Sequence, residues 1–162
     1  METVDQHIED ILYSVSDPEI PVLSIVDMGI IKKVEKLDDH FLIHITPTYS
    51  GCPAMDTIED DIVKAFDEEG LKAKVKHILS PAWTTDMITE KGKKALEEYG
   101  IAAPRDASID KAALSGEKNQ IKCTNCGSMN TKMVSRFGST ACKALFQCED
   151  CGEPFDYFKC LR

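Results

Sequence analysis

Two pairs of cysteines near the C-terminus have the residue type and the spacing needed to bind a metal ion. Cys123 and Cys126 form the first pair, Cys148 and Cys151 form the second, and 21 residues separate the pairs. Four thiolates at this spacing can close a tetrahedron around zinc, and the glycine after each pair suits the tight turn that such a site needs. The spacing therefore predicts a metal-binding ribbon. A structural zinc is one interpretation and a single redox-active iron is the other, because tetrahedral sulfur sites hold either metal.

A fifth cysteine, Cys52, lies in a second stretch that could do chemistry, residues 46–53. The apolar run 41–45 before it is typical of a buried strand, and apolar residues spaced by threes and fours after it are typical of a helix. We therefore predict a strand-to-helix turn with Cys52 at the helix N-cap and Pro53 at the first helical position. A thiol there would face unpaired backbone N–H groups and the positive end of the helix dipole, and both favour the thiolate. The alternative interpretation is an inert cysteine in a well-packed turn.

Two cysteines remain outside these stretches, Cys142 and Cys160. A free cysteine is by default a small buried hydrophobic residue, and this is the interpretation we favour for both. The alternative is a second pair of thiols, if the ribbon brings the two residues together.

The elements that must position Cys52 follow an α+β pattern. The sequence predicts a first helix that ends before Pro18, then a rigid acidic loop, and then a hairpin of strands 30–37 and 41–46. An amphipathic helix over 53–69 follows, and after it come a half-exposed strand over 71–76 and a last helix over 86–99. The order α-β-β-α-β-α predicts a small three-stranded sheet with helices, followed by a C-terminal zinc-ribbon module.

The cysteine pairs are set among three predicted strands, 131–137, 143–147 and 155–159. We therefore predict three parts: an α+β domain over 1–100, a linker over 101–119 and a zinc-ribbon domain over 120–162. About 43 residues cannot bury enough apolar surface to fold alone, so bound metal is expected to supply much of the folding energy of the ribbon.

Charge is spread unevenly along the 162 residues, whose net charge is −9. Residues 1–100 carry 10 Lys/Arg against 21 Asp/Glu, whereas residues 120–162 carry 6 against 4. Nucleic acid is therefore an unfavourable partner. No apolar run reaches the roughly 18 residues of a membrane helix, and the acidic N-terminus lacks the features of a secretory signal. We expect a cytoplasmic protein with no membrane partner, in which thiols stay reduced.

Motifs of a complete enzyme active site are absent from the sequence. None of the four histidines has a glutamate three residues before it, as a carboxylate-bridged di-iron site would require. There is also no phosphate-binding glycine loop, dinucleotide fingerprint or nucleophile elbow. The sequence therefore predicts a protein that is not catalytic alone.

Several segments carry a resemblance to known families. Residues 17–19, 27–29, 48–53 and 81–84 resemble the small α/β domain of metal–sulfur cluster assembly factors. The longer motifs 45–55, 138–145 and 153–160 resemble the D component of the bacterial phenylacetyl-CoA oxygenase (epoxidase) complex. This resemblance implies a role in aerobic phenylacetate breakdown. In that system other subunits hold the di-iron site and the flavin and iron–sulfur reductase, and the D component helps to mature or assemble them.

The resemblance and the missing oxygenase ligands lead to one hypothesis. The chain would be an accessory component of a multicomponent monooxygenase, in which Cys52 holds iron or an iron–sulfur cluster transiently. Possible further ligands or orienting groups are Asp17, Glu19 and Asp27, which could also simply cap loops. Thr46 and Thr48 could hydrogen-bond the site or could be ordinary strand and turn residues. Expected partners are the other oxygenase subunits, the reductase or the iron–sulfur assembly machinery. The alternative hypothesis is a non-catalytic scaffold that docks other subunits through the acidic helix and the ribbon.

Overall fold

The computed structural model describes residues 5–105, 107–118 and 121–159. Its contacts divide the chain into two compact units, Met1–Thr89 and Glu90–Arg162, which we call the N-terminal and the C-terminal unit. No helix in the described part of the chain is long and apolar enough to cross a membrane.

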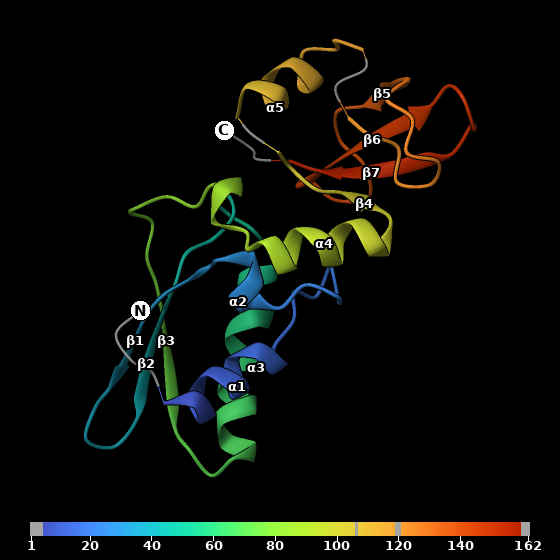
Figure 1. The fold of residues 1–162 in the computed structure, drawn as a ribbon. Coiled ribbons are helices and arrows are strands. Elements are labelled where there is room, and N and C mark those ends of the chain that lie inside the picture. The colour runs from blue at the N-terminus through green and yellow to red at the C-terminus, as the bar shows by residue number, and fades with distance from the viewer. Residues whose placement is uncertain (1–4, 106, 119–120, 160–162) are drawn as a thin grey trace. The chain divides into compact units, whose positions relative to one another are not determined.

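The N-terminal unit is built on a three-stranded sheet of order β1-β2-β3 (Figure 1). Strands β1 and β2 form the predicted antiparallel hairpin, and β3 lies parallel to β2 after a crossover through α3. The elements are α1 (Gln6–Ser14), α2 (Ile25–Met28), β1 (Ile31–Lys36), β2 (Phe41–Ile45), α3 (Ala54–Glu68), β3 (Ala73–His77) and the 3-10 turn η1 (Thr85–Met87). The predicted α+β architecture is confirmed.

Alternating and helical apolar patterns account for the core of this unit. Ile43 and Ile45 point to the same side of β2 and are fully buried. On α3, Ile58, Ile62 and Phe66 recur at helical spacing and are also buried. Because α1 and α3 lie to one side of the sheet (Figure 1), both helices bury their apolar faces there and leave the other side of the sheet outward.

The acidic loop before β1 contains a short helix that the sequence did not predict. Ser24 caps α2 by accepting a hydrogen bond from the Val26 N–H, and Gly29 ends the helix in the left-handed conformation with φ of 76°. A Cβ atom at Gly29 would lie 2.1 Å from the carbonyl oxygen of Met87, so the backbone of residues 85–89 can approach only because residue 29 is glycine.

We expect Gly29→Ala to lower the free energy of unfolding by about 2–3 kcal/mol, because it adds a backbone clash to the strain of a positive φ. Gly70→Ala is the matched control. Gly70 has φ of 72° but no atom within 4 Å of its Cβ position, so only the conformational strain of about 1 kcal/mol remains. Urea unfolding followed by circular dichroism measures both losses. Equal losses would contradict the close approach.

The C-terminal unit contains a four-stranded sheet of order β4-β7-β6-β5. Strands β5, β6 and β7 are antiparallel, close to where the sequence predicts them, and β4 adds parallel to β7. The elements are α4 (Glu90–Tyr99), β4 (Ile101–Ala102), α5 (Ala107–Leu114), β5 (Thr131–Ser135), β6 (Lys143–Cys148) and β7 (Pro154–Phe158). Strand β4 was not predicted because two residues show no alternation.

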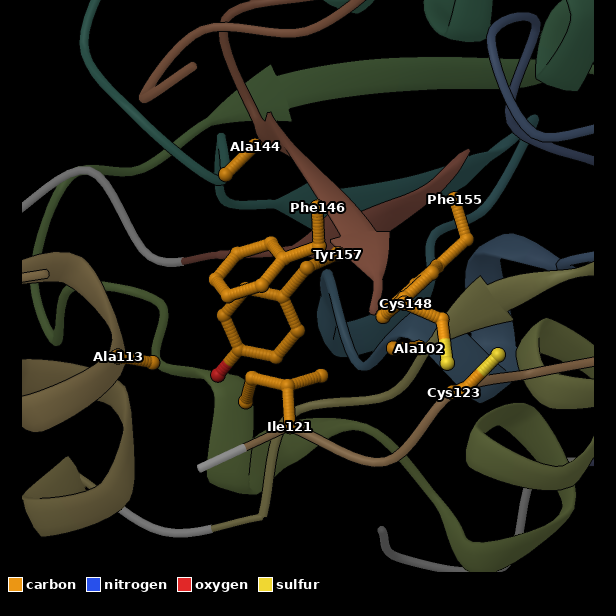
Figure 2. Close-up of a cluster of buried hydrophobic side chains, with 9 residues drawn as sticks. All are labelled: Ala102, Ala113, Ile121, Cys123, Ala144, Phe146, Cys148, Phe155 and Tyr157. Carbon is orange, nitrogen blue, oxygen red and sulfur yellow. The ribbon is translucent and has the colours of Figure 1, made fainter. Parts of the chain in front are cut away.

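A cluster of buried apolar side chains lies against this sheet (Figure 2). Its centre is aromatic, with the rings of Phe146 and Tyr157 in edge-to-face contact at 5.6 Å between centroids. Ala102 and Ala113 also belong to the cluster, although the sequence predicts residues 101–119 as a linker. The stretch thus contains β4 and α5 and contributes to the ribbon core. The domain boundaries at 100 and 120 remain a prediction.

Candidate metal centre and thiol site

The four predicted ligand cysteines come together in the C-terminal unit. The sulfur atoms of Cys123, Cys126, Cys148 and Cys151 all lie within 4.8 Å of one another. The Cys123 and Cys151 sulfurs are 3.7 Å apart, and those of Cys126 and Cys148 are 3.6 Å apart. A tetrahedral zinc with zinc–sulfur bonds of about 2.3 Å has sulfurs about 3.8 Å apart. The spacing of the sulfurs therefore fits a tetrahedral metal ion.

Both cysteine pairs sit in turns with the same backbone hydrogen bonds. In the first turn the Gly127 N–H donates to the Cys123 carbonyl at 3.0 Å, and the Cys123 N–H donates to Ser128 at 2.8 Å. In the second turn the equivalent bonds join residues 152 and 148 at 3.0 Å, and residues 148 and 153 at 2.9 Å. This repetition makes two equivalent knuckles that present two sulfurs each.

Polar side chains tie the two knuckles to each other. Asp150 accepts hydrogen bonds from the Ser128 hydroxyl at 2.5 Å and from the Asn130 amide at 2.8 Å. Both bonds lower the pKa of the Asp150 carboxyl, and the bond from Ser128 contributes more than the bond from Asn130. A second link starts from the first knuckle, where the Asn125 side-chain amide lies 3.7 Å from the Cys151 sulfur of the second knuckle. Such outer contacts fix the orientation of ligands before metal binds.

Cys151 and Cys126 differ in how readily they lose a proton. The Glu153 backbone N–H, helped by the Asn125 amide, lowers the pKa of Cys151 to about 7. The Ser128 backbone N–H also favours the thiolate of Cys126, but burial and the neighbouring sulfurs outweigh it and raise its pKa to about 12. Metal binding requires deprotonated thiols, so loading of this site would release protons and depend on pH.

Cys52 lies in the predicted loop between β2 and α3, but one position earlier relative to the helix than predicted. The N-cap residue is Pro53, which makes no side-chain capping bond, and α3 begins at Ala54. The Cys52 carbonyl accepts a hydrogen bond from the Met55 N–H at 3.3 Å. The side chain is half-buried. The turn and the following helix are therefore confirmed, and the capping role of Cys52 is wrong.

The surroundings of the Cys52 sulfur also correct the predicted ionisation. Burial raises the pKa of this thiol above its ordinary value. The Ala54 N–H and the Tyr49 and Thr48 side chains hydrogen-bond to the sulfur and oppose the rise, whereas the charge of Glu19 adds to it. The Ala54 N–H does favour the thiolate, as predicted, but burial outweighs it, so the net shift of the pKa favours the protonated thiol.

Two of the proposed supporting residues, Thr48 and Glu19, interact with the thiol. Tyr49 also does so but was not predicted from the sequence, although it lies three residues before Cys52 in the same turn. This spacing could have indicated the contact from the sequence, because the side chains of residues three apart in a turn can come close together.

The other two acidic residues have partners in the loops. Asp17 is buried, and its carboxylate accepts hydrogen bonds from the N–H groups of Glu19 at 2.8 Å and Ile20 at 2.9 Å. Asp27 is buried too and accepts from the Thr89 hydroxyl at 2.7 Å. Both carboxylates thus hydrogen-bond within loops, as the loop-capping alternative expects. A role of Asp17 and Asp27 toward Cys52 remains a prediction.

Thr46 directly follows β2 and is 1% exposed. Its N–H donates to the Ile30 carbonyl at 2.9 Å, but its hydroxyl has no hydrogen-bond partner among the described residues. A buried hydroxyl is normally paired, so this one is a candidate donor or acceptor for a ligand.

Cys142 is buried in the C-terminal unit, and its sulfur lies 3.1 Å from the Thr140 hydroxyl. Its burial agrees with the interpretation of a small core residue. Cys160 lies outside the described residues, so the alternative of a second thiol pair remains a prediction.

We expect alkylation of Cys52 by iodoacetamide in the metal-loaded protein to be slower at about pH 7.5 than alkylation of an unhindered cysteine, because the thiolate is the reactive form. Tyr49→Phe removes a donor to the sulfur, so the pKa should rise further and the rate fall about two- to fivefold. Glu19→Gln removes a repulsive charge and should act in the opposite direction. Mass spectrometry of the Cys52 peptide over a pH series measures the rates. If both variants shifted the rate in the same direction, these contacts would not control the thiol.

Comparison with known proteins places both units in families. Residues 5–76 match the family described as iron–sulfur cluster assembly protein, and residues 107–159 match the PaaD zinc beta ribbon domain. The DUF59 domain from Bacillus anthracis, a domain of unknown function, has a similar fold, with a TM-score of 0.52 and 25% identity. The match covers 57% of this chain and 90% of that one. Fold and site thus define an iron–sulfur assembly domain joined to a cysteine ribbon.

Relatives of known name identify the family of the chain more specifically. A protein of Escherichia coli K12 assigned as the D component of a 1,2-phenylacetyl-CoA epoxidase is 45% identical over 152 residues, which are 93% of this chain and 90% of that protein. An Fe–S protein maturation auxiliary factor of Porphyromonas gingivalis is 36% identical over 100 residues, which are 60% of this chain and 91% of its own. The chain belongs to the family of the phenylacetyl-CoA epoxidase D component.

Proposed function

We propose that the chain is an accessory component of a phenylacetyl-CoA epoxidase system that helps to mature its iron or iron–sulfur centres. Cys52 is the residue that binds the iron or the cluster transiently, and the other epoxidase subunits, the reductase and the iron–sulfur assembly machinery are the partners. Support comes from the names of two relatives, an epoxidase component and an Fe–S maturation factor.

The observation that carries this proposal is the surroundings of Cys52. The thiol is half-exposed, so a cargo can reach it, and two hydroxyl side chains and one backbone N–H hydrogen-bond to its sulfur. Hydrogen bonds to a metal-bound sulfur tune and orient such a ligand. Because the pKa of the free thiol is raised, a proton competes with the cargo for the sulfur, so loading and release would depend on pH.

The test is the metal content of the epoxidase in cells that carry Cys52→Ser. The oxygenase and the reductase, purified from these cells, are expected to contain less than about half of the normal iron, since serine is a poor iron ligand. Ser50→Ala, an exposed change in the same loop that keeps the thiol, is the control and should give normal iron content. Normal iron content in the Cys52→Ser strain would end the carrier proposal.

The ribbon is proposed to hold a structural zinc rather than iron. Four cysteines at tetrahedral spacing with no fifth donor among the described residues match a closed site. Protein purified without oxygen should contain one zinc per chain and be colourless. An absorption band typical of iron–sulfur bonds would contradict zinc in the ribbon if it persisted in Cys52→Ser.

A scaffold without cargo is the second candidate function, and the outer face of α3 favours it. Asp56 and Asp60 are exposed there, whereas Glu59 is engaged with His77 at 2.9 Å. Under this function Cys52→Ser is tolerated, and charge reversal of Asp56, Glu59 and Asp60 weakens assembly of the complex. The iron measurement above and a pull-down of the reversed variant separate the two functions.

A further inference from the structure

The side of the three-stranded sheet that faces away from α1 and α3 carries an ordered set of side chains (Figure 1). Strand register places Lys33, His44 and Lys76 in one row across the three strands. The neighbouring row is Glu35, Leu42 and Lys74. We call these six residues the sheet face. Neighbouring strands are about 4.8 Å apart, so each row spans roughly 10 Å.

Positive charge in the N-terminal unit is concentrated around this sheet. Residues 1–89 contain seven lysines and no arginine, against 18 Asp/Glu. Six of the seven lysines lie in β1, in β3 or directly before β3, and the seventh, Lys64, lies on α3. Three of these lysines, Lys33, Lys74 and Lys76, lie on the sheet face, where Glu35 is the one acidic residue among the six, whereas the exposed face of α3 is acidic.

Not all charges of the sheet face are free to meet a partner. Glu35 is bound on both sides, with Lys33 at 3.3 Å and His44 at 2.7 Å from its carboxylate. Lys74 and Lys76 are exposed and make no ion pair with any residue in the described ranges. Leu42 is half-buried between them and Glu35. The face thus has two exposed positive charges, Lys76 and Lys74, beside an apolar centre, and Lys74 also acts on the Asp39 carboxyl. This is the composition of a polar-rimmed protein interface.

We propose that the sheet face docks an acidic surface of another protein of the epoxidase system. The inference rests on the proposed function only in the choice of that system. Charge complementarity is the argument, because a matching acidic patch would meet the lysines while the rest of the unit repels it and so selects one orientation. Both β1 and β3 are edge strands, where lysines commonly prevent unwanted strand pairing, but edge protection alone does not require the three lysines to lie on one face of the sheet.

Other occupants of the sheet face fit less well. A nucleic acid extends beyond a face of this size and would also meet the acidic residues outside it. Residues 1–89 as a whole carry a net charge of −11, from 7 lysines and 18 acids. A second copy would have to offer its acidic α3 face. That contact joins two different surfaces, so it would build a ring or a filament instead of a two-fold dimer.

The experiment measures binding of the full chain to the remaining epoxidase subunits, purified as one assembly from cells that lack this chain. Lys74→Glu/Lys76→Glu should weaken binding at least tenfold in 50 mM salt, and by a smaller factor in 300 mM salt. The control is Lys36→Glu/Lys64→Glu, which changes the net charge equally. Lys64 is on α3, and Lys36 pairs with Phe41, whose ring contacts Phe66 on the helix side. The control should change binding less than threefold.

Several outcomes would overturn the docking inference. These are unchanged binding in the sheet-face variant, equal loss in the control, displacement of the assembly by a 20-nucleotide RNA, and rings or filaments of the chain alone that the variant abolishes. If the glutamate variant loses the circular dichroism of the folded protein, Lys74→Gln/Lys76→Gln replaces it with the same expected direction. The iron content of the oxygenase and reductase distinguishes the docking inference from the proposal that Cys52 carries iron. Loss of iron in Cys52→Ser with normal binding of the sheet-face variant refutes only the docking inference, and the reverse pair of results refutes only the carrier.

Discussion

Replacing Cys126 with serine is expected to unfold the ribbon, which is the largest effect that the structure predicts. Two of the nine residues in the buried cluster of the C-terminal unit, Cys123 and Cys148, are themselves predicted metal ligands (Figure 2). The metal therefore joins the two knuckles and closes the core at the same place. Structural zinc contributes roughly 10–16 kcal/mol in small zinc domains, more than the stability of a typical small domain.

The measurement is a two-dimensional amide NMR spectrum of the full chain. In Cys126→Ser, or after chelation, the signals of β5, β6 and β7 should collapse to the positions of unfolded chain, while those of the N-terminal unit keep their dispersion. Cys52→Ser is the matched control, since it also removes one thiol, and should change few signals. Asp150→Ala should be intermediate, with metal affinity about 10–100-fold weaker, because Asp150 only ties the knuckles together. Dispersed ribbon signals in metal-free Cys126→Ser would show that the ribbon folds without its metal.

The ribbon site could be predicted from sequence because its determinants are local. Each knuckle is made by a few consecutive residues, and the two knuckles repeat the same hydrogen bonds, so the spacing of the cysteines and glycines contains most of the information. The strand and helix around Cys52 were predictable for the same reason, since apolar periodicity reports which side of an element is buried.

The ionisation of Cys52 could not be predicted in this way. The sequence shows a cysteine at a helix start, and this alone favours the thiolate. How deeply the sulfur is buried depends on the packing of the loop, and burial determines the direction of the pKa shift. The partners of Asp27 show the same limit, because its hydrogen bond reaches Thr89, 62 residues away. Contacts of this range come from the tertiary fold, whose details no local pattern records.

Trp83→Ala is expected to be the most damaging single change in the N-terminal unit, with a loss of about 3–5 kcal/mol. Trp83 is 1% exposed and is among the largest fully buried side chains. Its indole N–H donates to the Met28 carbonyl at 2.8 Å. The ring thus joins the chain before η1 to the end of α2, and through that loop it holds the stretch that contains Asp27.

Trp83→Phe separates the two contributions of this side chain. Phenylalanine keeps most of the apolar volume but leaves the buried Met28 carbonyl without its donor, which costs about 1–3 kcal/mol. Thermal and urea unfolding followed by circular dichroism measure both variants. Metal content provides an internal control, because a change in the N-terminal unit should leave one metal per ribbon. A loss below about 1 kcal/mol for Trp83→Ala would mean that the indole only covers the surface of the loop, and the bond to Met28 would then not hold the α2 stretch in place.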